Sequence, residues 1–128
     1  MDGEELYLEI GFDEILFQLS KGLTIDQLKD GKRWFGFEQV KEWKNRMGYK
    51  LHIYSNDHLI ENKAHFHLTK ESESVDCKFD FKGNVLSCSQ GAVGRKIIDA
   101  LVYFCEQPKN YERLIQLWNI KNPKLIVE

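Results

Sequence analysis

Hydrophobic and polar residues alternate along the middle of the chain, which is the pattern of strands that bury one face. Because successive side chains of a strand point to opposite sides of the sheet, strict alternation gives one apolar and one polar face. The pattern predicts four strands, at about residues 49–55, 64–70, 75–82 and 85–89. The sequence therefore predicts an α+β fold, with a four-stranded antiparallel sheet and helices packed on its apolar face.

The turns between these strands set the expected register. Residues 71–74 are polar and suit a hairpin loop, while Gly83 and Asn84 are typical of a two-residue turn. A slip of one residue would move every polar side chain to the core, so any site depends on the register. Lys70 is expected opposite Val75. On the core side, the expected pairs are Leu68 with Cys77, Phe66 with Phe79 and Phe81 with Leu86. On the polar side, His65 is expected opposite Asp80 and His67 opposite Lys78, with Ser87 next to Asp80.

The first 48 residues form an N-terminal segment that the pattern predicts to be mainly helical. Residues 6–10 could form a short strand, and Asp13 could cap a helix over residues 14–19. Thr24 could cap a second short helix that extends to Leu28.

A third helix is expected at residues 37–47, with Gly48 just past its end. The preceding stretch, residues 31–37, reads GKRWFGF and combines basic with aromatic side chains. Such side chains stack on bases or anchor a protein partner, but with few basic residues the favoured interpretation is a loop that closes over the core.

Two amphipathic helices are expected after the sheet, over residues 95–105 and from about Pro108 to Asn122. Their apolar stripes predict packing on the core face of the sheet. The apolar tail at residues 125–127 could add an edge strand, either within the protein or to a partner. At 128 residues, the whole chain is expected to form one domain, with the sheet and the last two helices at residues 49–123.

Composition and charge narrow the possible partners. The chain has 18 basic and 20 acidic residues and a net charge of −2, which does not favour a broad contact with nucleic acid or membrane. No apolar run approaches the length of a membrane span. The cysteines Cys77, Cys88 and Cys105 lack CxxC spacing, and buried free thiols in a reducing compartment are the favoured interpretation. A cytoplasmic location is expected.

All four histidines fall within or beside the predicted sheet, which makes its polar face the candidate site. Two histidines at i and i+2 of a strand share a face, so His65 and His67 can act together, with His52 from the neighbouring strand and Asp80 opposite His65. These four residues are the candidate ligands of a divalent metal such as zinc. Without a metal, Asp80 could orient His65 as an acid–base pair.

The loop between the first two strands adds further polar groups, namely His58, Asp57 and Glu61. His58 could supply a further metal ligand or a catalytic acid, so the candidate catalytic residues are His58, His65, His67 and Asp80. Ser87 is near enough to be a nucleophile, although nothing in the sequence activates it.

Other interpretations of the histidines stay open. An antiparallel sheet commonly has one solvated face, and a polar face that meets water or a partner is the favoured interpretation. The ammonium of Lys78 beside His67 opposes a cation there. Burial of the histidines by the N-terminal segment is the remaining alternative.

The motifs SNDH at residues 55–58 and AHFHL at residues 64–68 resemble a family of small bacterial proteins, the domain of unknown function 4160 family. The likeness runs from about Lys50 to Pro123 and includes the glycine turn and the last two helices. The family's proline pair is missing at residues 59–63, where the loop is longer, and the first 48 residues lie outside the likeness.

The resemblance implies a bacterial or mobile-element origin and a small partner of the toxin–antitoxin kind, but no established activity. Two functions are therefore expected as alternatives. The favoured one is a cytoplasmic interaction domain that binds a protein partner or a second copy. The other is a metal-assisted or acid–base hydrolase, conceivably a nuclease, that uses the histidine cluster.

Overall fold

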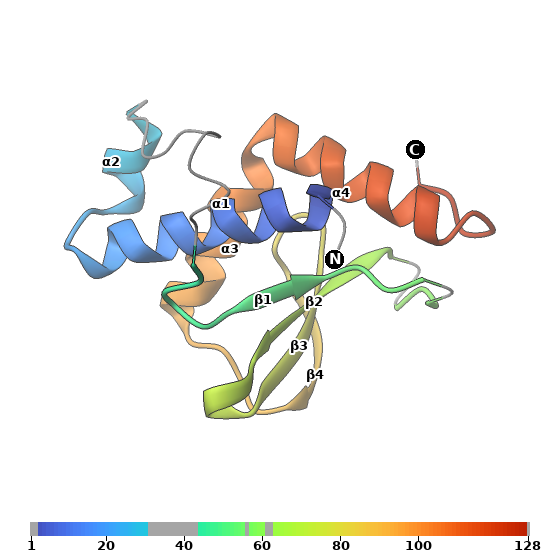
Figure 1. Cartoon of the computed structure of the whole chain (residues 1–128), viewed down its shortest axis with the longest axis horizontal. Helices are drawn as coiled ribbons and strands as arrows, with labels where there is room; N and C mark the ends of the chain where they lie inside the picture. Colours follow the sequence, from blue (N-terminus) through green and yellow to red (C-terminus); the bar gives the residue numbers. More distant parts are fainter. Residues whose placement is uncertain (1–2, 31–43, 56, 61–62, 128) are drawn as a thin grey trace.

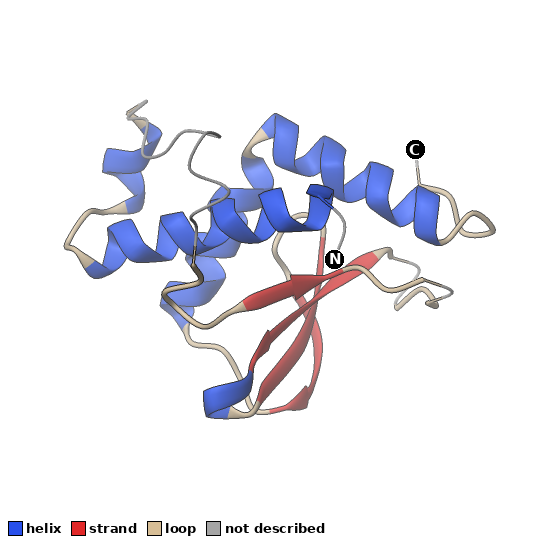
Figure 2. Cartoon of the chain, viewed as in Figure 1, coloured by secondary structure: helices blue, strands red, loops and turns tan. Residues whose placement is uncertain are grey.

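A computed structural model describes residues 3–30, 44–55, 57–60 and 63–127. It confirms the predicted α+β architecture, in which one antiparallel sheet lies against helices from both ends of the chain (Figure 1, Figure 2). The elements in chain order are α1 (Gly3–Ser20), α2 (Ile25–Lys29), β1 (Lys50–His52), β2 (His65–Lys70), η2 (Glu71–Glu73), β3 (Val75–Asp80), β4 (Val85–Gln90), α3 (Arg95–Glu106) and α4 (Pro108–Lys121).

The sheet has the strand order β1-β2-β3-β4, so β1 and β4 form its two edges. The register of β2 against β3 is the predicted one, with Phe66 opposite Phe79 and His65 opposite Asp80. His52 of β1 lies opposite His67. The alternation of apolar and polar positions therefore located both faces of the central strands correctly, because the pleat ties sequence parity to face.

The β3–β4 connection differs from the predicted two-residue turn. Its ends are joined by a hydrogen bond from the Asp80 N–H to the Asn84 carbonyl (3.0 Å), so residues 81–83 form the connection. The Asp80 carboxylate accepts the N–H groups of Lys82 and Asn84, both at 2.9 Å, and this local hydrogen bonding favours the longer turn.

The predicted pairs of Phe81 with Leu86 and of Ser87 with Asp80 are therefore wrong. The pairing of β3 with β4 also has two irregularities, one between Asp76 and Cys77 and one between Lys78 and Phe79. Phe79 lies opposite Val85, and Ser87 lies opposite Lys78.

The longer turn and the irregularity between Lys78 and Phe79 together correct the prediction for the cysteines. A two-residue turn would place Cys88 opposite Phe79, whereas the observed register places Cys88 opposite Cys77, and the two sulfur atoms form a disulfide. The expectation of free thiols is therefore wrong for this pair, and Cys105 alone is a free buried cysteine among the described residues. The cytoplasmic location rested partly on the expectation of free thiols, which the disulfide removes for two of the three cysteines. That location stays a prediction.

The N-terminal helix α1 replaces the expected short strand at residues 6–10 and the expected cap at Asp13, which lies inside the helix. The helix is buried on most sides, with Leu8, Phe12 and Ile15 in the core. A helix that is apolar nearly all round is stable only where other elements enclose it. Four acidic residues of the helix are buried as well, namely Glu5, Glu9, Asp13 and Glu14.

Three acidic side chains of α1 accept main-chain N–H groups from the segment that leads into and along β1. The Glu9 Oε1 atom accepts from Leu51 (3.1 Å), and the Glu5 Oε1 atom accepts from Ile53 (3.1 Å). Asp13 accepts from Met47 at 2.9 Å. We call Glu5, Glu9 and Asp13 the carboxylate ladder. Because β1 is an edge strand, the ladder supplies the acceptors that a further strand would otherwise provide.

The helices α3 and α4 bring apolar side chains to the core face of the sheet, as predicted. Phe104 of α3 contacts Phe12 edge-on at 5.7 Å between ring centroids, and Trp118 of α4 is fully buried. Gly83 lies against α3 with φ +89°, and a Cβ there would come within 2.8 Å of the Val102 nitrogen. Only glycine fits that turn.

Between α1 and β1, the structure tests only part of what the sequence predicts. Thr24 and Gln27 form a capping box at the start of α2, which confirms the expected helix. The basic-aromatic stretch at residues 31–37 and most of the expected helix at 37–47 lie outside the described residues, and its described part, residues 44–47, is not helical.

The C-terminal tail folds back on α4 and forms no strand. The Leu125 carbonyl accepts the Trp118 indole N–H at 2.7 Å, and Asn119 exchanges two hydrogen bonds with Val127. Side chains of α4 thereby satisfy the main chain of the tail. No helix in the described part of the chain is long and apolar enough to cross a membrane.

The carboxylate ladder gives a first testable prediction. Glu9→Ala leaves the buried N–H of Leu51 without an acceptor, which we expect to lower the free energy of unfolding by about 1–3 kcal/mol in urea titrations. Glu9→Gln keeps an oxygen in place and is expected to cost less. Glu112→Ala on the exposed side of α4 is the control and should change little.

The pH dependence of the Glu9→Gln difference checks the cause. Burial is the largest influence on Glu9 and raises its pKa, so the folded state disfavours the ionised form. Relative to Glu9→Gln, the wild type should therefore gain stability as pH falls from 7 towards the unfolded-state pKa of about 4.3. If the free energy of unfolding changed with pH equally in the two proteins, or in the opposite sense, a buried ionisable carboxyl group at Glu9 would be excluded.

Candidate functional site

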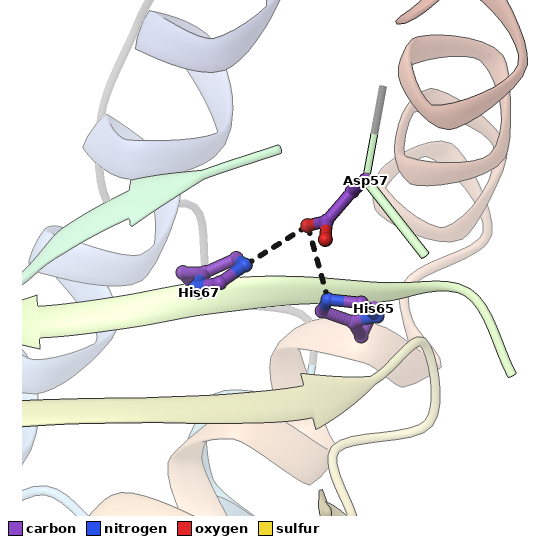
Figure 3. A group of neighbouring side chains, drawn as sticks. All are labelled: Asp57, His65 and His67. Carbon is purple, nitrogen blue, oxygen red and sulfur yellow. Dashed lines mark hydrogen bonds and ion pairs between the residues drawn. The ribbon is translucent and has the colours of Figure 1, made fainter. Parts of the chain in front are cut away.

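The polar face of the sheet carries a compact group of three titratable side chains: Asp57, His65 and His67. Strand β2 supplies both histidines, two residues apart, so their rings leave the same face of the strand. Asp57 comes from the loop between β1 and β2, which returns over that face. Figure 3 shows the Asp57 carboxylate directed at the two rings. We call these residues the Asp57 centre.

A single oxygen atom joins the group. Asp57 Oδ2 lies 3.1 Å from His67 Nε2 and 3.1 Å from His65 Nε2. One ligand atom from each of the three residues lies within 4.8 Å of the others. Three potential donor atoms therefore converge on one small volume.

The two contacts differ in geometry. The contact between His67 Nε2 and Asp57 has the alignment of a hydrogen bond. The His65 contact is equally short but is not aligned, and neither ring nitrogen of His65 makes an aligned hydrogen bond with a described residue, although the main chain of Lys63 is near enough to oppose the lowering of the His65 pKa. The His65–Asp57 contact is therefore electrostatic, and His65 is a buried side chain whose ring nitrogen atoms lack aligned hydrogen bonds.

The centre is buried although it lies on the polar face. His65 is 0 % exposed and His67 is 8 % exposed. The indole ring of Trp118 lies 5.4 Å from the His65 ring, and the Tyr54 ring meets the His67 ring edge-on at 4.4 Å. Among the described residues these aromatic rings and the Asp57 loop enclose the histidines, so the simple solvated face is not what forms.

Burial and charge set the protonation of two members. Burial lowers the pKa of His65 most strongly, and the positive charge of His67 adds to this, against the opposing effect of the Asp57 carboxylate. Burial would raise the pKa of Asp57, but the His58 N–H, the His67 hydrogen bond and the charges of both histidines outweigh it and hold that pKa below its usual value. Near neutral pH, an ionised Asp57 therefore faces a neutral His65.

The opposite side of the His67 ring faces a second carboxylate. Nδ1 of His67 lies 3.9 Å from Asp76 Oδ1, too far for a hydrogen bond, and that buried oxygen has no other hydrogen-bond partner among the described residues. In the hydrogen bond to the ionised Asp57 carboxylate, the His67 proton lies on Nε2. A metal ion at the centre would displace that proton, and a proton on Nδ1 would then be attracted to Asp76.

His58 stands at the outer edge of the centre. Its ring is 76 % exposed, and its Nδ1 atom lies 3.1 Å from Asp57 Oδ1. The same oxygen accepts the main-chain N–H of His58 at 2.9 Å. His58 therefore contacts the second oxygen of the carboxylate whose first oxygen faces His65 and His67, and it meets solvent.

The structure places the other predicted site residues outside the group. The His52 ring stacks beside Tyr54 at 5.7 Å and lies 3.7 Å from Glu5. The Asp80 carboxylate is held by the N–H groups of Lys82 and Asn84, by the Asn84 side chain and, at 3.5 Å, by Lys63. Asp80 is thus opposite His65 in register, but its oxygens are committed to the turn.

Asp57 takes the position in the group that the pairing pattern suggested for Asp80. The sequence marked Asp57 as a polar loop residue, but register alone cannot show that this loop folds back over the sheet. The informative signal is its place next to His58, in a short polar segment that directly follows a histidine-bearing strand.

Two imidazoles and a carboxylate are a common ligand set for zinc and other divalent transition metals. In a tetrahedral site with bonds of about 2.0–2.2 Å, ligand atoms are about 3.3 Å apart. Two separations in the Asp57 centre, both 3.1 Å, are close to this value, and all three ligand atoms lie within 4.8 Å of one another.

Comparison of the chain with protein-family models, with curated proteins and with solved structures finds no match in any of the three. The resemblance at residues 55–58 and 64–68 therefore stays a prediction.

Asp80 gives a second prediction, on pH. Burial would raise the pKa of Asp80, but hydrogen bonds from Asn84 and Lys82 and the charge of Lys63 hold it below the usual value. A lowered carboxyl pKa stabilises the fold above the unfolded-state pKa of about 3.9, and this contribution is lost as pH falls through the folded-state value.

Asp80→Asn should therefore be less stable than the wild type at pH 7, by about 1–3 kcal/mol in urea titrations. Near pH 3 the difference should shrink. A constant difference across this range would mean that the ionisation of Asp80 contributes nothing to the turn.

Proposed function

We propose that the chain is a metal-dependent hydrolase whose divalent ion, of the zinc class, is bound by Asp57, His65 and His67. The observation that carries the proposal is the single carboxylate oxygen that lies 3.1 Å from both imidazole Nε2 atoms. The mixed nitrogen and oxygen donors favour zinc, iron, cobalt or manganese over calcium or magnesium, which prefer oxygen ligands.

The charge balance of the centre supports a cation. Asp57 is ionised, and the His65 ring is neutral and buried with no aligned hydrogen bond among the described residues. A lone pair of the neutral His65 ring that faces the Asp57 oxygen would repel it unless a proton or a metal ion lay between them. A metal ion would satisfy all three groups at once, including the otherwise unsatisfied His65.

Three protein ligands leave one tetrahedral position for water or substrate, which separates a catalytic site from a closed structural site. A bound ion supplies a Lewis acid and lowers the pKa of a coordinated water towards neutrality. The protein's part is to hold the three ligands and to exclude bulk water from His65 with the Trp118 indole. The ring of Tyr54 does the same for His67.

His58 is placed to move protons at this centre. Its imidazole contacts Asp57 Oδ1 and is exposed to solvent, so it can exchange protons with water while staying beside the ligand carboxylate. In hydrolysis it would take a proton from the attacking water and return one to the leaving group.

A second candidate function is protein interaction, and the edge strand β4 favours it. The carboxylate ladder covers the edge of β1, whereas β4 is exposed along nearly its whole length. An uncovered edge can add a strand from a partner or from a second copy of the chain. Hydrolysis remains the better supported function because β4 shows no specific chemistry.

Metal content gives the third prediction. We expect about one equivalent of zinc, iron, cobalt or manganese in protein purified without a histidine tag, measured by mass spectrometry of the elements. The double variant His65→Ala/His67→Ala and the single variant Asp57→Ala should each lose most of it.

The matched control is His52→Ala. This variant removes a histidine from the same face of the sheet, opposite His67, but outside the Asp57 centre. It should retain the metal. A wild type that binds no divalent metal, or a His52→Ala variant that loses as much as the double variant, would contradict the proposal.

Activity gives the fourth prediction. Metal-loaded wild type should hydrolyse at least one member of a panel of nitrophenyl esters and phosphate esters, and the double histidine variant should not. His58→Ala should keep its metal and lower kcat by about 10²-fold, as expected for loss of a general acid–base. Equal rates for wild type and double variant would exclude this centre as the catalyst.

A further inference from the structure

The C-terminal end of helix α4 lies against the loop that carries Asp57. We propose that Asn122 is a positioning residue that holds Asp57 where it can bind the metal together with His65 and His67. This inference rests on the proposed function, because it assigns a role towards the same centre.

Asn122 joins the helix to two points of the loop with one side chain. Its Oδ1 atom accepts the main-chain N–H of Asp57 at 2.6 Å, and its Nδ2 atom donates to the carbonyl of Tyr54 at 3.0 Å. The residue is buried, with 3 % exposure. Both ends of the amide are thus occupied, and the main chain at residues 54 and 57 is fixed relative to α4.

The helix itself is firmly anchored at this end. The N–H of Asn122 donates to the Trp118 carbonyl at 2.7 Å, and the Asn122 carbonyl accepts from Leu125 at 2.9 Å. Lys121 donates to the Ile53 carbonyl at 3.0 Å and pairs with Glu5. The end of α4 therefore serves as a rigid support for the chain that leaves β1.

The same end of α4 contacts a second ligand of the centre. Trp118 packs against the His65 ring, while Asn122 holds Asp57. A displacement of α4 would move the loop ligand away from the strand ligands, because β2 stays fixed by its pairing with β1 and β3.

The need for such support follows from where the ligands come from. His65 and His67 lie on a central strand whose pairing fixes their positions. Asp57 lies on a loop, where no strand pairing fixes its main chain. Groups behind the direct ligands commonly alter metal affinity by about 10–100-fold when they are removed. We expect Asn122 to act in this range, because a shift of about 1 Å is enough to disturb a preorganised site.

The chain offers a matched control on the same helix. Asn119 also makes two hydrogen bonds to the main chain, to the N–H and carbonyl of Val127 at 2.7 and 2.9 Å, but it holds the tail and not the Asp57 loop. Asn122→Ala and Asn119→Ala thus remove the same side chain and equivalent hydrogen bonds.

The experiment measures zinc affinity by competition with a chelating dye. We expect Asn122→Ala to bind zinc about 10–100-fold more weakly than the wild type and Asn119→Ala to stay within about 2-fold. The bound cobalt spectrum of Asn122→Ala should resemble that of Asp57→Ala, because both lose the carboxylate ligand.

A double-mutant cycle separates positioning from a general loss of stability. In an Asp57→Ala background, Asn122→Ala should have no further effect on zinc affinity, since the ligand that it positions is already absent. Circular dichroism checks that each variant is folded. If Asn122→Ala does not fold, Asn122→Asp replaces it in the cycle, because it keeps the acceptor for the Asp57 N–H and replaces the donor to the Tyr54 carbonyl with a carboxylate oxygen that repels it.

The outcomes distinguish this inference from the proposed function. Wild-type affinity in Asn122→Ala, or an equal loss with and without Asp57, would overturn the positioning role and leave the metal centre standing. A wild type that binds no divalent metal would overturn both.

Discussion

Acceptance of main-chain N–H groups by the carboxylate ladder is the interaction on which the rest of the structure depends. Along a helix, residues four apart are separated by about 6 Å, and along a strand, residues two apart are separated by about 6.6 Å. Glu9 and Glu5 therefore match Leu51 and Ile53 almost in step. This match docks an almost wholly buried helix on the sheet edge and satisfies donors that would otherwise be buried without partners.

The docking also decides where the candidate centre forms. The main chain at Ile53 is held on one side by Glu5 and on the other by Lys121, so it leaves β1 at a defined point. Asn122 then holds it at Tyr54 and Asp57, which brings the carboxylate over β2. Helices from the two ends of the chain thus place one loop, and the loop places one oxygen atom between two histidines.

The sequence was sufficient for features that depend on local alternation and insufficient for those that depend on distant partners. Parity along β2 placed His65 and His67 on one face and Phe66 on the other, because a pleated strand leaves no other choice. Residues 6–10 look like a strand in the sequence. Only the tertiary structure shows that Glu5 and Glu9 lie on a helix and accept main-chain N–H groups at β1. Asp80 was a reasonable ligand by register, but its nearest donors lie in its own turn. Asp57 required knowledge of how a loop folds back.

On a solvated polar face, the histidines and Asp57 would keep their contacts with water. Here His65 is fully buried, and its nitrogen atoms lack aligned partners among the described residues, which is an arrangement that costs free energy in the absence of a cation. Packing of the surrounding core must offset that cost. The rings of Trp118 and Tyr54 belong to this packing and hold the two histidine rings in place. A ligand that binds only the folded chain would stabilise it, by about 4 kcal/mol when the free ligand concentration is about a thousand times the dissociation constant. Strain of this kind, supported by a well-packed core, is what a preorganised metal site requires.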